Sequence, residues 1–162
     1  MQKETTTLLL RKAIESDLEA FFGNQLDEEA GYMAAFTAKD PTDKEAYMAK
    51  WTALINNEAV NIKTILLGAE IAGSVSTYEM EGEPQITYWI GKQYWGKGIA
   101  TQALQAFLKD MKERPVYGRI AIDNIGSRRV LEKCGFEMIA REHGFANARN
   151  MEIEELVFKL ST

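Results

Sequence analysis

The chain has 162 residues, 46% of them hydrophobic and 27% charged, which is enough to build the core of one domain spanning residues 1–162. Its 24 acidic and 19 basic side chains give a net charge of -5, which disfavours broad electrostatic binding to nucleic acid or to an anionic membrane. A single cysteine, Cys134, and a single histidine, His143, exclude an internal disulfide and a Cys/His metal cluster. Because the sequence also lacks a signal-peptide pattern and a run long enough to span a membrane, a soluble, cytoplasmic protein is expected.

The N-terminal part of the sequence predicts one strand followed by helices. Residues 6–14 are rich in threonine and apolar side chains and predict the strand. Two Ser/Thr-x-x-Glu spacings, at 16–19 and 42–45, are typical of capping boxes, so a short helix ending near Phe22 and a longer second helix are expected to begin there. Between them, residues 24–36 mix acidic and aromatic side chains and predict a short helix or an irregular turn that covers the core.

The middle of the chain predicts an antiparallel meander that leads into a central strand. Residues 62–78 are expected to form a hairpin around 68–70, and residues 81–84 turn the chain into the next strand. In residues 85–90 apolar and polar side chains alternate with the period of two that a strand requires. From Ala100 onward the apolar spacing changes to that of one helical face, so a strand, a turn and a helix follow one another directly.

The C-terminal part predicts a strand, a helix and a closing hairpin. Residues 116–122 form a short apolar strand, and residues 127–133 have helical spacing, followed by a glycine suited to a left-handed C-terminal cap. The hairpin is expected in residues 137–141 and 151–160, with His143 in the polar turn between them. Taken together, the elements predict an α+β fold.

A Gly-Lys-Gly turn joins the central strand to the helix that follows it. Gly96 and Gly98 let a ligand approach the backbone, and the helix start offers free N–H groups and a positive dipole end, which suits a phosphate. A Walker A loop is excluded because its lysine would follow the second glycine. A dinucleotide-binding loop, with Asp123 as the ribose acid, fits less well because Thr101 occupies the third glycine position and too little chain follows. A tight connection without a ligand is the third alternative.

Two stretches resemble the motifs of the GNAT superfamily of N-acetyltransferases. Residues 94–101 are similar to the loop that binds the pyrophosphate of coenzyme A, with Gly98 and Ala100 at its last two fixed positions. Trp95 stands where glutamine or arginine is usual, a departure that resembles the branch of ribosomal-protein and amino-terminal acetyltransferases. Residues 124–136 resemble a second family motif, which ends in Gly-Phe. With these motifs in the family's order, the resemblance covers nearly the whole chain.

The resemblance implies the GNAT fold, with a mixed, mostly antiparallel central sheet flanked by helices. It also implies a transferase that moves the acetyl group of acetyl-CoA to an amine by direct attack in a ternary complex, without a metal. The acceptor would be an amine-bearing small molecule or a protein N-terminus, and the protein a monomer or a homodimer. Two alternatives are a CoA-binding module with weak catalysis and a small nicotinamide-binding oxidoreductase.

The cofactor-binding residues are carried over from the two motifs and the central strand. In the family, backbone N–H groups of the loop hold the pyrophosphate, the central strand holds the pantetheine arm, and the second motif contributes to the thioester end. The residues expected to contact acetyl-CoA are Trp89, Ile90, Trp95, Gly96, Lys97, Gly98, Ile99, Ala100, Thr101, Asn124, Ser127 and Arg128.

The catalytic residues depend on a departure from the family pattern. Many members have a tyrosine that protonates the leaving thiolate at the position of Leu131, and leucine cannot donate a proton. The resemblance therefore suggests Ser127 as the acid, although a serine there could simply cap the short helix. Tyr88 is the second catalytic candidate, with a packed aromatic ring as its alternative.

Three residues are candidates for binding the acceptor. Tyr32 and Phe36 lie in the segment expected to cover the core, and Glu79 lies just before the turn that leads to the central strand. Each has a structural alternative, because the two aromatic rings could only pack the core and the acid could only face solvent.

Overall fold

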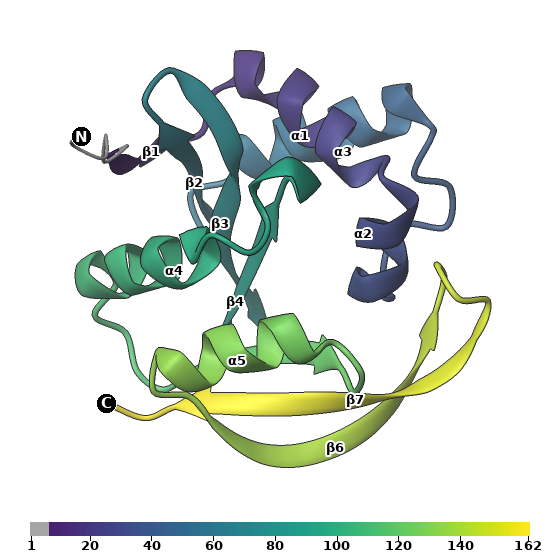
Figure 1. Cartoon of the computed structure of the whole chain (residues 1–162), viewed down its shortest axis with the longest axis vertical. Helices are drawn as coiled ribbons and strands as arrows, with labels where there is room; N and C mark the ends of the chain where they lie inside the picture. Colours follow the sequence, from purple (N-terminus) through teal and green to yellow (C-terminus); the bar gives the residue numbers. More distant parts are fainter. Residues whose placement is uncertain (1–6) are drawn as a thin grey trace, which may run out of the picture.

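The computed structural model describes residues 7–162, so Thr6, at the start of the predicted first strand, lies outside the described residues. The elements follow the predicted order (Figure 1). They are β1 (Leu8–Lys12), the 3-10 turn η1 (Glu15–Asp17), α1 (Leu18–Gln25), α2 (Glu28–Ala34), α3 (Lys44–Ile55), β2 (Asn61–Leu67), β3 (Glu70–Met80), β4 (Glu83–Ile90), the 3-10 turn η2 (Lys92–Tyr94), α4 (Ile99–Asp110), β5 (Val116–Ala121), α5 (Ile125–Lys133), β6 (Glu137–Ala146) and β7 (Met151–Leu160).

The strands form one sheet in the order β1-β2-β3-β4-β5-β7-β6. Each neighbouring pair is antiparallel except β4 and β5, which run parallel. The α+β class and the mixed, mostly antiparallel sheet predicted from the sequence are therefore confirmed. The parallel pair also marks a change in chain path, because α4 carries the chain from the end of β4 back to the start of β5.

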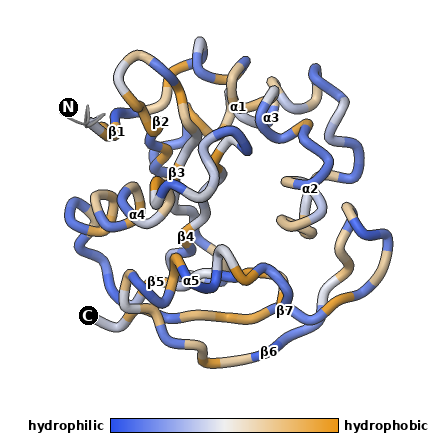
Figure 2. The backbone as a smooth tube through the Cα atoms, in the orientation of Figure 1, coloured by the Kyte–Doolittle hydropathy of each residue, from blue (hydrophilic) through white to orange (hydrophobic). Residues whose placement is uncertain are grey.

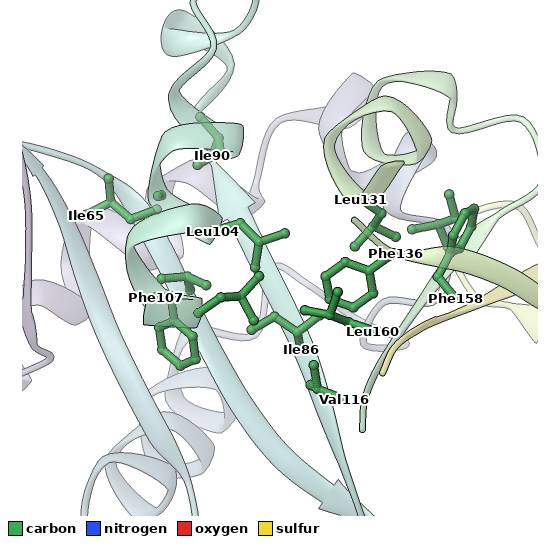
Figure 3. Close-up of a cluster of buried hydrophobic side chains, with 14 of the residues drawn as sticks. Ile65, Ile86, Ile90, Leu104, Phe107, Val116, Leu131, Phe136, Phe158 and Leu160 are labelled. Carbon is green, nitrogen blue, oxygen red and sulfur yellow. The ribbon is translucent and has the colours of Figure 1, made fainter. Parts of the chain in front are cut away.

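Helices cover both faces of the sheet (Figure 1). The larger core lies between the sheet and α4 and α5, and Leu104, Phe107, Leu131 and Phe158 are almost completely buried in it (Figure 3). A smaller cluster lies beneath α1 and α3 on the other face, around Phe21. These layers leave β4 in the middle of the sheet, with buried side chains on both faces.

Sequence pattern explains α4 and α5. In α4 the buried positions recur every three or four residues, and hydrophobic and hydrophilic positions alternate along its turns (Figure 2). The last turn of α5 closes as predicted: Gly135 has a φ of 92°, and the N–H groups of Gly135 and Phe136 bond to the carbonyls of Glu132 and Leu131. This left-handed cap turns the chain directly into β6.

The predicted helix starts were wrong in detail. Asp17, not Ser16, stabilises the chain before α1, because its carboxylate accepts a hydrogen bond from the Ile14 N–H at 3.0 Å. Asp43, not Thr42, caps α3 by accepting from the Ala46 N–H. In both places the aspartate one residue further along provides the hydrogen bond: Asp43 accepts from a free N–H of the first turn of α3, whereas Asp17 accepts from the N–H that precedes its helix.

Two element lengths also differ from expectation. The first helix continues to Gln25, beyond the predicted end near Phe22, and β6 runs to Ala146, so His143 lies in a strand rather than in a turn. The added residues of β6 pair with β7, including His143 opposite Glu154. Within residues 7–162, no helix is both long enough and apolar enough to cross a membrane.

Candidate active site

The pairing between β4 and β5 stops after two residue pairs. Gln85 lies beside Tyr117 and Ile86 beside Gly118, and no later residue of β4 pairs with β5. On its other side β4 stays paired with β3 as far as Ile90. The rest of β4 therefore turns one backbone edge towards the opening between the two strands.

Gly118 lies at the point where this opening begins. A Cβ there would lie 3.2 Å from the Leu131 side chain and 3.3 Å from that of Ile86, which is tighter than ordinary packing. Glycine thus lets α5 and β4 approach β5 at the last paired position. The side chains of Leu131 and Ile86 then fill the closed end of the opening.

A cavity of about 670 Å³ occupies the opening, within the range typical of small-molecule sites. Its walls come from α1, α3 and their connecting loops, from β3, β4 and β5, and from the start of α5. Aromatic rings dominate the side towards α1 and α3. The aromatic residues that line the whole cavity are Phe21, Phe36, Tyr47, Trp51, Tyr78, Tyr88 and Trp89.

Tyr88 and Ser127, the two catalytic candidates, meet in this cavity. The Tyr88 hydroxyl donates a hydrogen bond to the Ser127 backbone carbonyl over 3.4 Å, and both residues line the cavity. Burial raises the pKa of Tyr88 to about 12, the hydrogen bond to Ser127 acts to lower it, and Cys134 acts to raise it. The hydroxyl therefore keeps its proton near neutral pH.

Asn124, and not Ser127, caps α5. The Asn124 Oδ1 accepts a hydrogen bond from the Ser127 N–H at 3.2 Å, and its Nδ2 donates to the Met33 carbonyl at 3.2 Å. The alternative that Ser127 is present as the helix cap is thus wrong. Asn124 also connects the end of α2 to the start of α5. This contact holds residues 24–36, which we call the lid, against the cavity.

The Gly-Lys-Gly loop lies at the start of α4, as predicted. Gly96 and Gly98 have φ angles of 76° and 74°, and a Cβ on either would meet no atom within 4 Å. No side chain within the described residues caps α4 at Gly98, so the N–H groups of its first turn have no side-chain acceptor. The Trp95 indole donates to the Ile90 carbonyl at 2.9 Å and fixes the loop to the end of β4.

The acceptor candidates are separated by the fold. Phe36 lines the cavity, whereas Tyr32 packs beneath the Arg149 guanidinium, 4.2 Å from its ring centre. Glu79 is exposed and points away, because its neighbours Tyr78 and Met80 face the cavity and side chains alternate along a strand. Among the three, the structure brings only Phe36 to the cavity.

The cofactor candidates fall into two groups. Trp89, Asn124 and Ser127 line the cavity, and residues 95–101 lie in the loop and first turn of α4. Ile90 is instead buried in the main core. On the outer face of α5, Arg128 forms an ion pair with Glu132 at 2.9 Å.

Sequence reasoning missed three polar residues of the cavity, Asn24, Arg119 and Glu155. Asn24 Nδ2, like Nε1 of the expected Trp89, is a buried donor without a partner among the described residues. At the far end, Arg119 of β5 bonds through its Nη1 to Glu155 of β7 and to Glu142 of β6. No local pattern in the sequence indicates these neighbours, because strands distant in the chain bring them together. Residues 7–162 contain no cluster of acidic, histidine and cysteine side chains suited to a metal.

The family model for the acetyltransferase (GNAT) domain matches residues 7–137. Three solved structures illustrate the similarity of fold. An acetyltransferase of the GNAT family from Bacillus anthracis has 21% identity and a TM-score of 0.77, and the match covers 97% of this chain and 96% of that one. A ribosomal L7/L12 alpha-N-protein acetyltransferase in complex with coenzyme A has 23% identity and a TM-score of 0.78, and the match covers 94% of this chain and 94% of that one.

The third structure is the microcin C7 self-immunity acetyltransferase MccE in complex with acetyl-CoA and AMP. It has 17% identity and a TM-score of 0.78, with 96% of this chain and 92% of that one covered. No curated protein sequence matches the chain. At these identities the structures show a common fold, and they leave the acceptor of this protein to be inferred from its own residues.

Proposed function

Because the chain belongs to the GNAT acetyltransferase family, we propose that it transfers the acetyl group of acetyl-CoA to an amine, in a small molecule or at a protein N-terminus. The observation that carries the proposal is the opening between β4 and β5, where the strand pairing stops and the cavity contains Tyr88 and Ser127. Two of the similar structures hold coenzyme A or acetyl-CoA, which supports the same cosubstrate here. The branch of amino-terminal acetyltransferases stays a hypothesis that rests on Trp95.

The residues fit acetyl-CoA at both ends of the opening. The uncapped first turn of α4, with Gly96 and Gly98 open to solvent, would hold the pyrophosphate through backbone N–H groups. The free edge of β4 beyond Ile86 offers strand-like hydrogen bonds to the amide groups of the pantetheine arm. Acetyl-CoA supplies the activated acetyl group, and the protein orients it towards the aromatic side of the cavity.

The transfer needs one proton removed and one delivered. The acceptor amine must lose a proton before it attacks the thioester carbonyl, and the sulfur that leaves must gain one. The buried, protonated Tyr88 hydroxyl is the donor that the geometry favours for the sulfur, and Ser127 lies beside it. Leu131, buried at the position where many relatives have tyrosine, has no proton to give.

Replacement of Gly98 with valine tests the cofactor loop. The new side chain would occupy the space where a pyrophosphate approaches the backbone, so calorimetry should show at least a tenfold loss of acetyl-CoA affinity. Gly68→Val is the matched control, because Gly68 also has a positive φ and open surroundings but lies in the β2–β3 turn. Equal affinities in two folded variants would refute the loop assignment.

A panel of amines tests the reaction itself. Released thiol, measured with acetyl-CoA and each amine, should rise with at least one acceptor. If the protein binds acetyl-CoA but acetylates none of the panel, the weakly catalytic CoA-binding module becomes the better interpretation.

A further inference from the structure

A second hollow adjoins the main cavity on the face of the sheet opposite α4 and α5. It has a volume of about 260 Å³, and Met80 and Arg119 line both spaces. Its other walls come from the β3–β4 turn, from the paired start of β4 and β5, and from β6 and β7. Gln85 of β4 and Tyr117 of β5 are among the residues that line it.

The charge of this hollow is negative. Three of its lining residues are glutamates, Glu81, Glu83 and Glu142, against the one guanidinium of Arg119. Arg119 is itself paired with Glu142 and with Glu155 of the main cavity. Lys159 lies over the Tyr117 ring, 5.9 Å from its centre, but does not line the hollow. The acids of the turn are thus not neutralised by Arg119.

A buried acceptor atom points to the same kind of ligand. Gln85 is only 3% exposed, and its Oε1 is buried without a hydrogen-bond partner among the described residues. A buried carbonyl oxygen in this state needs a hydrogen-bond donor, because an unpaired buried acceptor is destabilising. The Nε of Arg119, also buried without a partner, lines the same hollow, so a water molecule between the two atoms is the competing explanation.

We infer that this hollow binds a second cationic group of the acceptor, a primary ammonium, while the amine to be acetylated lies beside Tyr88. The inference rests on the proposed acetyl transfer. Gln85 precedes Tyr88 by three residues on β4, about 10 Å along the strand, and because side chains alternate the two residues point to opposite faces of the sheet. An acceptor that reaches both sites passes through the opening between β4 and β5 and carries two ammonium groups at least that far apart, as a long free diamine does or as a lysine near the start of a peptide does.

Three amines of matched chemistry test the site by turnover. Octamethylenediamine has two ammonium groups at the required separation, octylamine has one, and trimethylenediamine has two that are too close. The kcat/KM with acetyl-CoA should be about tenfold or more higher for octamethylenediamine than for either of the others, as expected for hydrogen bonds to a charged group. A short peptide with a lysine in its third position distinguishes a peptide acceptor from a free diamine.

The double variant Glu81→Gln, Glu83→Gln locates the effect. It should abolish the preference for octamethylenediamine and leave the kcat/KM for octylamine within about twofold, whereas Glu113→Gln, at an exposed acid that lines neither space, should preserve the preference. Equal kcat/KM for octylamine and octamethylenediamine, or a preference that survives in the double variant, would overturn the inference in favour of bound water.

Direct binding separates this inference from the proposed function. Calorimetry of octamethylenediamine against octylamine needs no turnover, and the diamine should bind about tenfold more tightly to the wild-type protein than to the double variant. If no amine is acetylated but this difference is found, the reaction fails and the cation site stands. If amines are acetylated and the two affinities are equal, the site fails and the reaction stands.

Discussion

The two halves of the sheet differ in how they are held together and in what they do. Eight residue pairs join β3 to β4, and six join β5 to β7, so each half has a continuous antiparallel ladder. The two pairs between β4 and β5 are the only strand pairing in the described chain that joins the halves. The candidate active site lies where that pairing ends, so the weakest join in the sheet is also the place with free backbone groups.

The halves also differ in their polar contacts. In the first, the buried Asp17 carboxylate accepts hydrogen bonds from Arg11, Thr64 and the Ile14 N–H, all within that half. In the second, the polar contacts reach across the opening to α2, as when Arg149 bonds to both the Tyr32 carbonyl and Asp123. The first network stabilises one half, and the second positions a lid. Substitutions in each half should therefore have separable effects on stability and on turnover.

The largest expected effect is a loss of stability from Asp17→Asn. The change removes the charge of a buried carboxylate that pairs with the partly exposed Arg11 and accepts from the Thr64 hydroxyl, so the free energy of unfolding should fall by about 2–3 kcal/mol. Turnover of the protein that remains folded should change little, because Asp17 does not line the cavity. Thermal and denaturant unfolding measure the free energy of unfolding, and a thiol-release assay at low temperature measures turnover. Asp40→Asn, at an exposed carboxylate, should leave the melting temperature nearly unchanged.

The same residue predicts a dependence on pH. Burial alone would raise the pKa of Asp17, but the hydrogen bonds from Arg11, Thr64 and Ile14 outweigh it and lower the pKa to about 2, from 3.8. The unfolded chain therefore takes up this proton at a higher pH than the folded one. The stabilisation is complete above pH 3.8 and is lost as the pH falls towards 2, so wild type and Asp17→Asn should converge in stability over that interval.

In the opening itself, Tyr88→Phe should affect turnover and not folding. Removing the proton donor should lower kcat by roughly 10²-fold, with acetyl-CoA affinity unchanged. Because the pKa of Tyr88 is raised to about 12, kcat of the wild type should show no alkaline limb near pH 10.0, the ordinary pKa of a tyrosine. Tyr94→Phe, which removes an exposed hydroxyl bonded to Glu70, is the control. A Tyr88→Phe protein with the wild-type kcat would assign the proton transfer to Ser127 or to solvent.

These regions were not equally predictable from the sequence. The alternation in β4 and the helical spacing of α4 are local, and the strand, loop and helix between residues 85 and 110 formed as expected. The helix starts were missed by one residue at Ser16 and Thr42, because the Ser/Thr-x-x-Glu spacing does not show whether the side-chain oxygen of that residue or of the aspartate after it accepts the backbone hydrogen bond. For Asp17, the deciding partner, Thr64, lies 47 residues away in the chain.

In the candidate site, too, local features could be predicted from the sequence and contacts between distant segments could not. The glycine loop could be predicted because glycine is needed locally for its two left-handed residues. Tyr32 could not be assigned, because the Arg149 that covers its ring belongs to the distant β6–β7 turn. Arg119 and Glu155 were missed because they meet only when β5 and β7 pair. Residue types and spacing thus indicate the cofactor loop, whereas the acceptor side depends on contacts between distant strands.

A smaller effect is expected from separating the two hydrogen bonds of Asn124. Asn124→Asp keeps an oxygen to cap α5 but removes the donor to the Met33 carbonyl, whereas Asn124→Ala removes both. The alanine variant should lose about 1 kcal/mol more stability than the aspartate variant, which is the usual value of a helix cap. Both should raise the KM for the acceptor, because α2 is freed from α5. If the aspartate variant behaves as wild type in both measurements, the contact with Met33 does not position the lid.

The smallest expected effect is that of Ser127→Ala, and it decides between two roles for the serine at the opening. Since Asn124 provides the cap, the loss of the Ser127 hydroxyl should change the free energy of unfolding by less than about 0.5 kcal/mol, as for substitutions away from a structural feature. The backbone carbonyl that accepts the Tyr88 hydrogen bond is retained. If Ser127 only contacts the thioester end, kcat should fall by about fivefold, the value of one lost hydrogen bond. A fall of 10²-fold or more, with Tyr88→Phe near wild type, would instead make Ser127 the proton donor. Single-turnover rates of the two variants and of the double variant measure this, because two residues in one proton path give a combined loss smaller than the product of the separate losses.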